Sequence, residues 1–155
     1  MSAALPFPSV AWFARLGEMM SANSTRQIQL GTVDCVARFT VLKGGNDGSD
    51  WSADVSFEEY GVADVREPRP GEAARADFAL EADLPTWREM IENIAAGKGR
   101  PDLEHTLNRL SHTGAPFFLR SDDVLRADMY FRFNQSLQEF VNASAQFETR
   151  FPARK

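Results

Sequence analysis

The sequence predicts a single α+β domain, in which an antiparallel-rich sheet of about five strands is covered by helices. Three observations predict it. Several segments alternate apolar and polar residues, as strands with one wet face do. The connections between them are too short to hold crossover helices, which disfavours a doubly wound parallel sheet. A wide apolar stripe over residues 124–147 predicts a long C-terminal helix whose apolar face must be covered.

Length and composition agree with one domain over residues 1–155. The hydrophobic content is 43% and the charged content is 25%, both ordinary for a globular chain. The net charge is -5 and the basic residues are scattered, so we expect no nucleic-acid partner. No stretch approaches the roughly 18 apolar residues of a membrane span. The N-terminus has no secretory signal pattern, and we therefore expect a cytoplasmic protein.

Four segments between residues 32 and 82 are predicted to be strands, and three of them, residues 32–42, 51–58 and 76–82, have the two-residue period of strands. The turn-forming residues 44–50 join the first two segments, which predicts a hairpin. Pro68 and Pro70 end the third segment, because proline has no N–H to donate to a sheet. The four predicted strands are residues 32–42, 51–58, 60–66 and 76–82.

Two helices are predicted from their starting residues. Ser9 can accept a free backbone N–H at the start of a helix over residues 10–20. Asp83 is placed as the cap of a second helix, with Pro85 in its first turn, and Gly97 ends that helix.

The second half of the chain adds three smaller predictions. Asp102 is expected to cap a short helix with three leucines on one side. The apolar run within residues 115–120 can form a fifth strand. Asp122 or Asp123 is then expected to cap the closing helix. The three leucines are Leu103, Leu107 and Leu110.

The closing helix has an apolar arc of roughly 160° at about 100° per residue. Arg126 interrupts that arc, and it can reach water, pair with a carboxylate or anchor an acidic ligand head group. Phe131 lies among the polar residues. Its three possible roles are an ordinary exposed side chain, a subunit contact or a lid against a ligand. The arc consists of Leu125, Met129, Phe133, Leu137, Phe140, Val141, Ala143 and Phe147, with the small Ser136 and Ser144.

The sequence has no strong catalytic pattern. The glycines of residues 44–48 lie in a hairpin and not between a strand and a helix, which argues against a phosphate-binding loop. Cys35 lies in an alternating apolar run and is expected to be a buried filler. We therefore expect no catalytic residues and no cofactor.

A metal site is also not expected. His105 and His112 are the only histidines, and with Asp102 and Glu104 they show no recognised ligand spacing. Acid–base chemistry through His105, Asp128 or Tyr130 stays open as an alternative.

Residues 76–87 resemble a stretch of sterol carrier protein type-two-like domains, where a strand beginning with alanine and aspartate leads to a helix bearing an aromatic residue. The order of the preceding elements is also similar. Those domains commonly place a glycine-containing strand ending in Gly-Asp before the last helix, whereas Phe117 to Asp122 here lack the glycine. The resemblance implies a twisted sheet, a hydrophobic tunnel for fatty acyl chains or sterols, and no catalytic residues.

Our leading hypothesis is therefore non-catalytic binding or transfer of a lipophilic small molecule, in a cavity between the sheet and the helices. Bulky apolar residues predicted to face that cavity are the expected ligand contacts. These are Phe39, Phe57, Phe78, Leu80, Trp87, Met129, Phe133, Leu137 and Phe140.

Two alternatives stay open. One is an enzyme that acts on a hydrophobic substrate through His105 and a nearby carboxylate. The other is a subunit with a packed core that forms a homodimer through Phe131 and the exposed side of Trp12.

Overall fold

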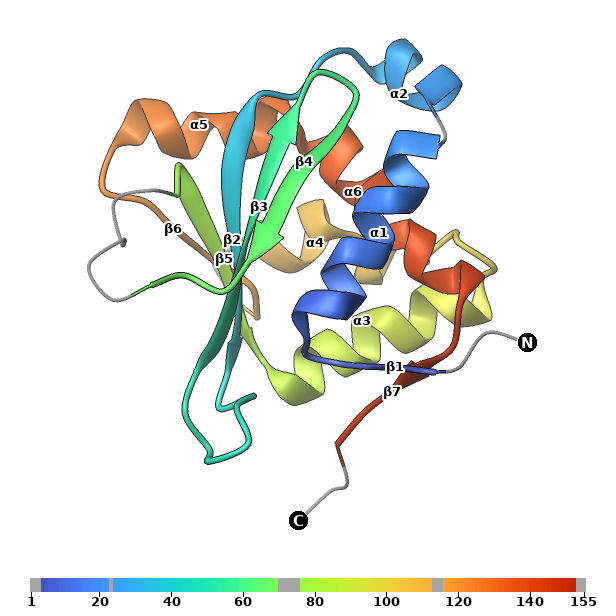
Figure 1. Cartoon of the computed structure of the whole chain (residues 1–155), viewed down its shortest axis with the longest axis vertical. Coiled ribbons are helices and arrows are strands. Elements are labelled where there is room, and N and C mark those ends of the chain that lie inside the picture. The colour runs from blue at the N-terminus through green and yellow to red at the C-terminus, as the bar shows by residue number, and fades with distance from the viewer. Residues whose placement is uncertain (1–3, 23, 70–75, 113–115, 153–155) are drawn as a thin grey trace.

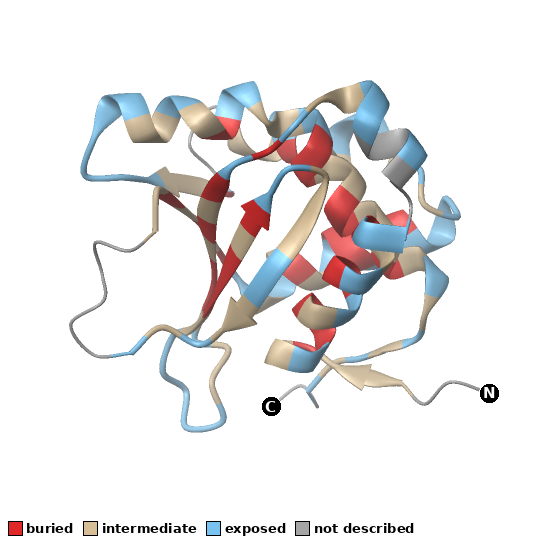
Figure 2. Ribbon diagram, turned by 45° about the horizontal axis from the view of Figure 1, so that its top comes forward, coloured by how far each residue is buried: buried red, intermediate tan, exposed pale blue. Residues whose placement is uncertain are grey.

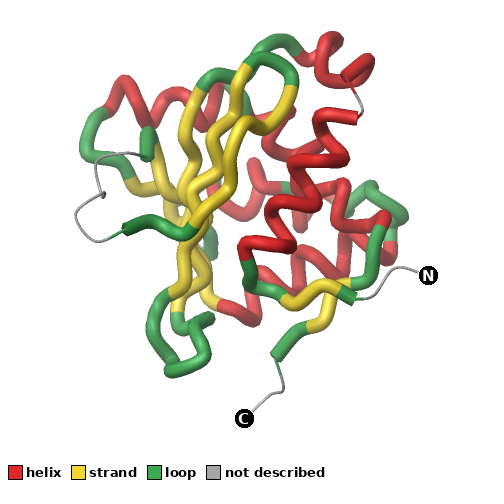
Figure 3. Tube along the Cα trace, in the orientation of Figure 1, coloured by secondary structure: helices red, strands yellow, loops and turns green. Residues whose placement is uncertain are grey.

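The fold is α+β, as the sequence predicts, with a five-stranded sheet in the order β4-β3-β2-β5-β6 and helices packed against it (Figure 1). The structure is a computed structural model, and it describes residues 4–22, 24–69, 76–112 and 116–152. In Figure 3 the strands form one layer and most of the helices a second layer beside it.

The predicted strands are all present and most of them pair antiparallel. β2 (Cys35–Leu42) and β3 (Trp51–Glu58) form the hairpin, and β4 (Gly61–Arg66) adds to β3. β5 (Phe78–Asp83) pairs with β2, and β6 (Phe118–Arg120) pairs antiparallel with β5. The β2–β5 pair is parallel, which the sequence did not predict, because β5 joins the sheet beside β2 and not beside β4.

The alternation of the strands separates two faces of the sheet. Phe39, Val55 and Leu80 lie on the face that the helices cover, and each is at most 1% exposed. On the opposite face, Arg38 donates to both carboxylate oxygens of Asp54, at 2.7 and 3.0 Å. The apolar core thus lies between the helices and one face of the sheet. In Figure 2 the buried segments are found in the central strands and in the helices beside them.

The predicted caps form at both early helices. The Ser9 hydroxyl accepts the Trp12 N–H (3.1 Å) at the start of α1 (Val10–Ala22), and α2 (Ser24–Leu30) follows. Asp83 accepts the Thr86 N–H (2.9 Å) at the start of α3 (Leu84–Ala96), which ends at Gly97.

Helix α1 lies very close to the edge strand β4. A Cβ atom at Gly17 would be 3.0 Å from the Cβ of Val62, so glycine allows this approach. The chain ends also pair, since β1 (Leu5–Pro6) runs parallel to β7 (Thr149–Arg150), and the Trp12 indole donates to Thr149 Oγ1 at 2.9 Å.

The short helix after Asp102 differs from the prediction. It is divided into the 3-10 helix η2 (Leu103–His105) and α4 (Leu107–Ser111). Thr106 caps α4, and the Asp102 side chain makes no capping hydrogen bond. The predicted leucine stripe is wrong at Leu103, which is 83% exposed, because the break turns it away from the other two leucines.

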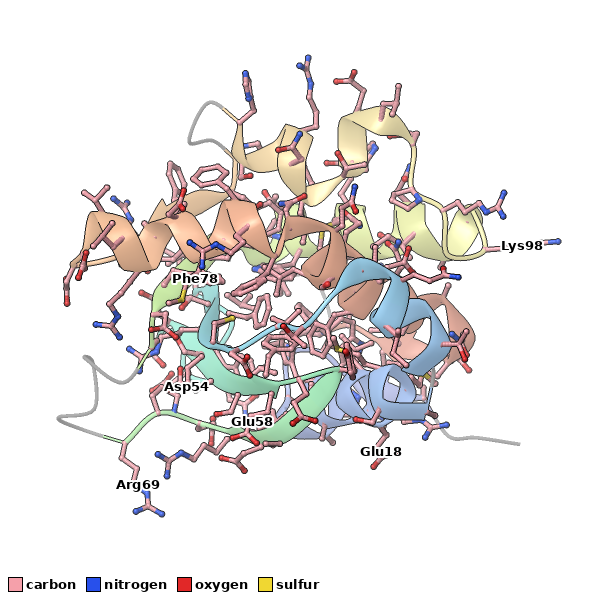
Figure 4. All side chains as sticks on the ribbon, turned by 90° about the horizontal axis from the view of Figure 1, so that it is seen from above. Glu18, Asp54, Glu58, Arg69, Phe78 and Lys98 are labelled. Carbon is pink, nitrogen blue, oxygen red and sulfur yellow. The ribbon has the colours of Figure 1, made fainter. Side chains whose placement is uncertain are left out.

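The closing helix is also divided. It consists of α5 (Val124–Arg132), α6 (Asn134–Asn142) and the 3-10 helix η3 (Ala143–Gln146), and Phe133 separates the first two. Asp123, one of the two predicted caps, accepts the Leu125 N–H at 2.8 Å. Figure 4, seen from above, shows α5 and α6 following one another across the molecule.

Candidate functional site

The residues predicted to contact a ligand belong to one hydrophobic cluster between the sheet and the helices or pack against it. Seven of the nine are at most 2% exposed, and Met129 and Phe133 are half-buried at its border. The seven buried residues are Phe39, Phe57, Phe78, Leu80, Trp87, Leu137 and Phe140.

Phe140 of α6 is central to this cluster. Its ring stacks on Phe39 of β2, with centroids 5.8 Å apart, and meets Phe57 of β3 edge-on at 5.1 Å. Trp87 of α3 contacts Phe39 from another side at 6.1 Å. Aromatic pairs at these distances attract one another beyond their buried area. The cluster therefore ties α3 and α6 to the middle of the sheet.

Trp87 also makes a polar contact and packs against an aromatic residue of the segment before the last helix. Its indole N–H donates to the carbonyl oxygen of Thr40 at 3.0 Å, which satisfies the one polar group of a fully buried side chain. Phe117, one of the bulky residues before the last helix, is fully buried against Trp87 at 4.9 Å. Phe118 instead lies half-buried beneath the guanidinium of Arg120.

The opposite end of the cluster lies under α5. Phe78 of β5 meets the ring of Tyr130 at 5.7 Å, and Figure 4 shows Phe78 beside this helix. Tyr130 is the one buried residue of α5. Its hydroxyl donates to the carbonyl oxygen of Leu107 at 3.1 Å and is 2.7 Å from Ser111 Oγ. Helix α5 is thus held to α4 by a buried hydroxyl.

On sequence grounds Tyr130 is a candidate only for acid–base chemistry, and its burial in the core is not among the predictions. It lies four residues after Arg126 and seven before Leu137, and that spacing puts it in the apolar arc. Burial raises the pKa of the Tyr130 hydroxyl, whereas Ser111 and Asn134 beside it lower that pKa. The hydroxyl therefore stays protonated near neutral pH and acts as a hydrogen-bond donor.

The outer side of α5 is unusually apolar. Val124 is 85% exposed, Leu125 is 79% exposed and Phe131 is 60% exposed. Phe131 faces solvent, as its place among polar residues predicts. Leu125 was expected in the buried arc, but the helix break at Phe133 turns α5 away from the direction of α6.

Arg126 pairs with a carboxylate, one of the three roles that the sequence left open. Its Nε lies 3.1 Å from Asp77 Oδ1, and its Nη2 donates to the carbonyl oxygen of Ala76. The other oxygen of Asp77 accepts the Val36 N–H at 2.7 Å. The guanidinium is therefore engaged by the protein itself, which argues against a role for it in holding an acidic head group.

A separate groove of about 1110 Å³ lies on the far side of α3, between that helix, the β2–β3 loop and the C-terminal segment. None of the nine predicted ligand contacts lines it. Arg88 lies over the ring of Phe151 at 4.9 Å and pairs with Glu92, so its charge is already engaged. Among the described residues that line the groove there is no serine, threonine or cysteine to act as a nucleophile.

His105 lines this groove and contacts two carboxylates. Its Nδ1 is 2.6 Å from Asp102 Oδ1, and its Nε2 is 3.5 Å from Glu89 Oε1. Asn93 clamps Asp102 through two further hydrogen bonds. The hydrogen bond with Asp102 raises the pKa of His105, partial burial opposes the rise, and Glu89 adds to it. These contacts join η2 to α3.

Cys35 is buried, as its alternating apolar run predicts. Burial, with the nearby Asp77 and Asp34 carboxylates, raises the pKa of its thiol to about 12, so the thiolate is scarce at neutral pH. In the described part of the chain, no group of three or more His, Cys, Asp or Glu side chains could hold a metal ion. No helix in the same residues combines the length and the apolar character that a membrane crossing needs.

The fold of this chain is similar to that of sterol carrier proteins of known structure. A crystal structure of sterol carrier protein 2 superimposes with a TM-score of 0.64 at 16% identity, covering 88% of this chain and 95% of that chain. A conserved hypothetical protein from Thermus thermophilus, described as possibly a sterol carrier protein, gives a TM-score of 0.62 at 16% identity. That match covers 98% of this chain and 96% of the other.

No family model matches the sequence. No curated protein matches it either. The two structural matches show that the chain has the sterol carrier protein 2 fold over most of its length, as the resemblance of residues 76–87 predicts.

Proposed function

We propose that this protein binds or transfers a small lipophilic molecule, such as a fatty acyl chain or a sterol, without catalysis. The ligand would occupy the space between the sheet and the helices α5 and α6. The sterol carrier fold supports this class of ligand. The location is supported by one apolar cluster that holds seven of the nine candidate contacts, with Met129 and Phe133 packed against it.

Burial along the last helices indicates which part of the cluster a ligand would displace. The cluster changes in character along the last helices: α6 buries Ser136, Leu137, Phe140 and Val141, whereas α5 buries only Tyr130. Met129 and Phe133 are half-buried at this end of the cluster. A ligand could therefore displace the edge of the core beneath α5 while the α6 side stays packed.

Native mass spectrometry of the freshly purified protein, followed by solvent extraction, tests the proposal. We expect a co-purified lipid, or, after delipidation, binding of added fatty acids, acyl-CoA or sterols. The proposal fails if no lipid is extracted and none of these ligands binds.

A contact between two copies is a second candidate role, favoured by the 60% exposure of Phe131. Trp12 takes no part in it, contrary to the prediction, because α1 packs it fully inside the core. Equilibrium sedimentation at high concentration would show a dimer that Phe131→Ser weakens. Monomer alone would rule out this role.

A further inference from the structure

We infer that α5 is a hinged cover over the Phe78 end of the apolar cluster, and that two polar latches hold it closed. The inference rests on the proposed function, because it assigns the route by which a lipophilic ligand reaches the cluster. The route requires α5 to swing about Phe133 while α6 stays in place.

The hinge is the break between the two helices. Phe133 has φ -102° and ψ 13°, outside the helical values of its neighbours, and it gives α6 no side-chain cap. The backbone hydrogen bonds from Phe133 N–H to Met129 and from Leu137 N–H to Phe133 are kept, at 2.9 and 3.0 Å. Large motions of an element are commonly absorbed by one or two such residues at its end.

The two sides of the hinge differ in burial. Leu137, Phe140 and Val141 fix α6 to the sheet and are at most 1% exposed. On α5, Val124 and Leu125 are already in water, so moving the helix exposes little further apolar surface from that end. A segment with few buried apolar contacts opens locally more often than the core does.

The first latch is Arg126 with Asp77. Asp77 is fixed to β2 through the Val36 N–H, and Ser121 at the approach to α5 donates to its carbonyl oxygen at 2.7 Å. The Arg126 guanidinium therefore joins the start of α5 to the sheet beside β5.

The second latch is Tyr130 with α4. Its hydroxyl reaches Leu107 and Ser111, and α4 is itself held to α6 because Gln138 Oε1 accepts the Leu107 N–H at 2.8 Å. When Tyr130 leaves this position, the ring of Phe78 loses its cover. The apolar cluster then opens to solvent at the end where Met129 and Phe133 form its border.

Hydrogen exchange of the ligand-free protein, read by mass spectrometry, tests the cover directly. We expect amides of α5 to exchange about ten-fold faster or more than those of β2 and β3, as local opening below global unfolding requires. Arg126→Gln and Tyr130→Phe should each speed exchange in α5 several-fold further and leave β2 and β3 unchanged. Asp128→Asn is the matched control, because Asp128 lies on the same helix and its exposed side chain forms only a surface pair with Arg132.

With a bound fluorescent fatty acid, the two latch variants should raise the association and dissociation rates together and change Kd little. The cover is ruled out if α5 is as protected as β2 and β3, or if the latch variants speed exchange equally throughout the chain. A mobile α5 in a protein that binds no lipophilic ligand would contradict the proposed function instead. A well-protected α5 in a protein that does bind lipid would contradict the cover alone.

Discussion

The ring of Phe140 stacks on the ring of Phe39, with planes 22° apart and centroids separated by 5.8 Å. This pair joins α6 to the middle of the sheet, in the segment that the proposed ligand does not displace. We expect Phe140→Ala to lower the free energy of unfolding by about 3–5 kcal/mol, because it leaves a cavity in a packed core. Urea denaturation measures the change. Leu125→Ala, on an exposed site, should stay within about 0.5 kcal/mol of the parent.

The ion pair of Arg38 and Asp54 is the main polar structure on the other face of the sheet. Asp54 is fully buried and Arg38 is 16% exposed, so removing the carboxylate leaves a poorly solvated guanidinium. We expect Asp54→Ala to cost about 3 kcal/mol of stability in urea denaturation.

The exposed pair of Arg15 and Glu18 is the control for that change, and Figure 4 shows Glu18 at the surface. Glu18→Ala should cost no more than about 1 kcal/mol, because solvent screens such pairs. Equal losses for the two variants would show that burial of Asp54 has no energetic consequence.

His105 should make stability depend on pH. Its folded pKa is raised, so the stability it contributes is fully present below its ordinary pKa of 6.5 and is lost as pH rises through the folded pKa. Asp102 has the opposite sign: the hydrogen bond from His105 lowers its pKa, and its contribution is lost in acid. Thermal unfolding midpoints from pH 5 to 9 should therefore fall more in the parent than in His105→Gln. Parallel pH profiles of the two proteins would contradict this assignment.

The strands and most of the caps were predictable because they depend on local chemistry, although Asp102 makes no capping hydrogen bond. The alternation in residues 51–58 and the Asp83–Pro85 helix start need only neighbouring residues, and both match the structure. The parallel pairing of β5 with β2 was not predictable in this way, because it depends on which distant strand offers an open edge.

The candidate site was predictable in part. Apolar periodicity correctly predicts that Phe140 and Leu137 are buried. The same periodicity places Tyr130 in the apolar arc, although Tyr130 is not among the predicted contacts. It could not identify the break at Phe133, because the arc continues through that residue without a proline or glycine to mark it. Leu125 was misplaced for the same reason.

The most direct measurement of the central claim is the affinity of a fluorescent fatty acid for the parent protein and for variants that fill the proposed site. Met129→Trp enlarges a half-buried side chain at the border of the cluster under α5, and Met19→Trp makes the same change on α1, where the side chain is also half-buried. Circular dichroism and urea denaturation should first show that both variants fold.

If the ligand lies between the sheet and the last helices, the parent and Met19→Trp should bind the probe with equal affinity. Met129→Trp should bind it at least about ten-fold more weakly, which is a loss of about 1.4 kcal/mol. Equal binding by all three proteins would place the ligand elsewhere. Absence of binding in all three would contradict lipid binding itself.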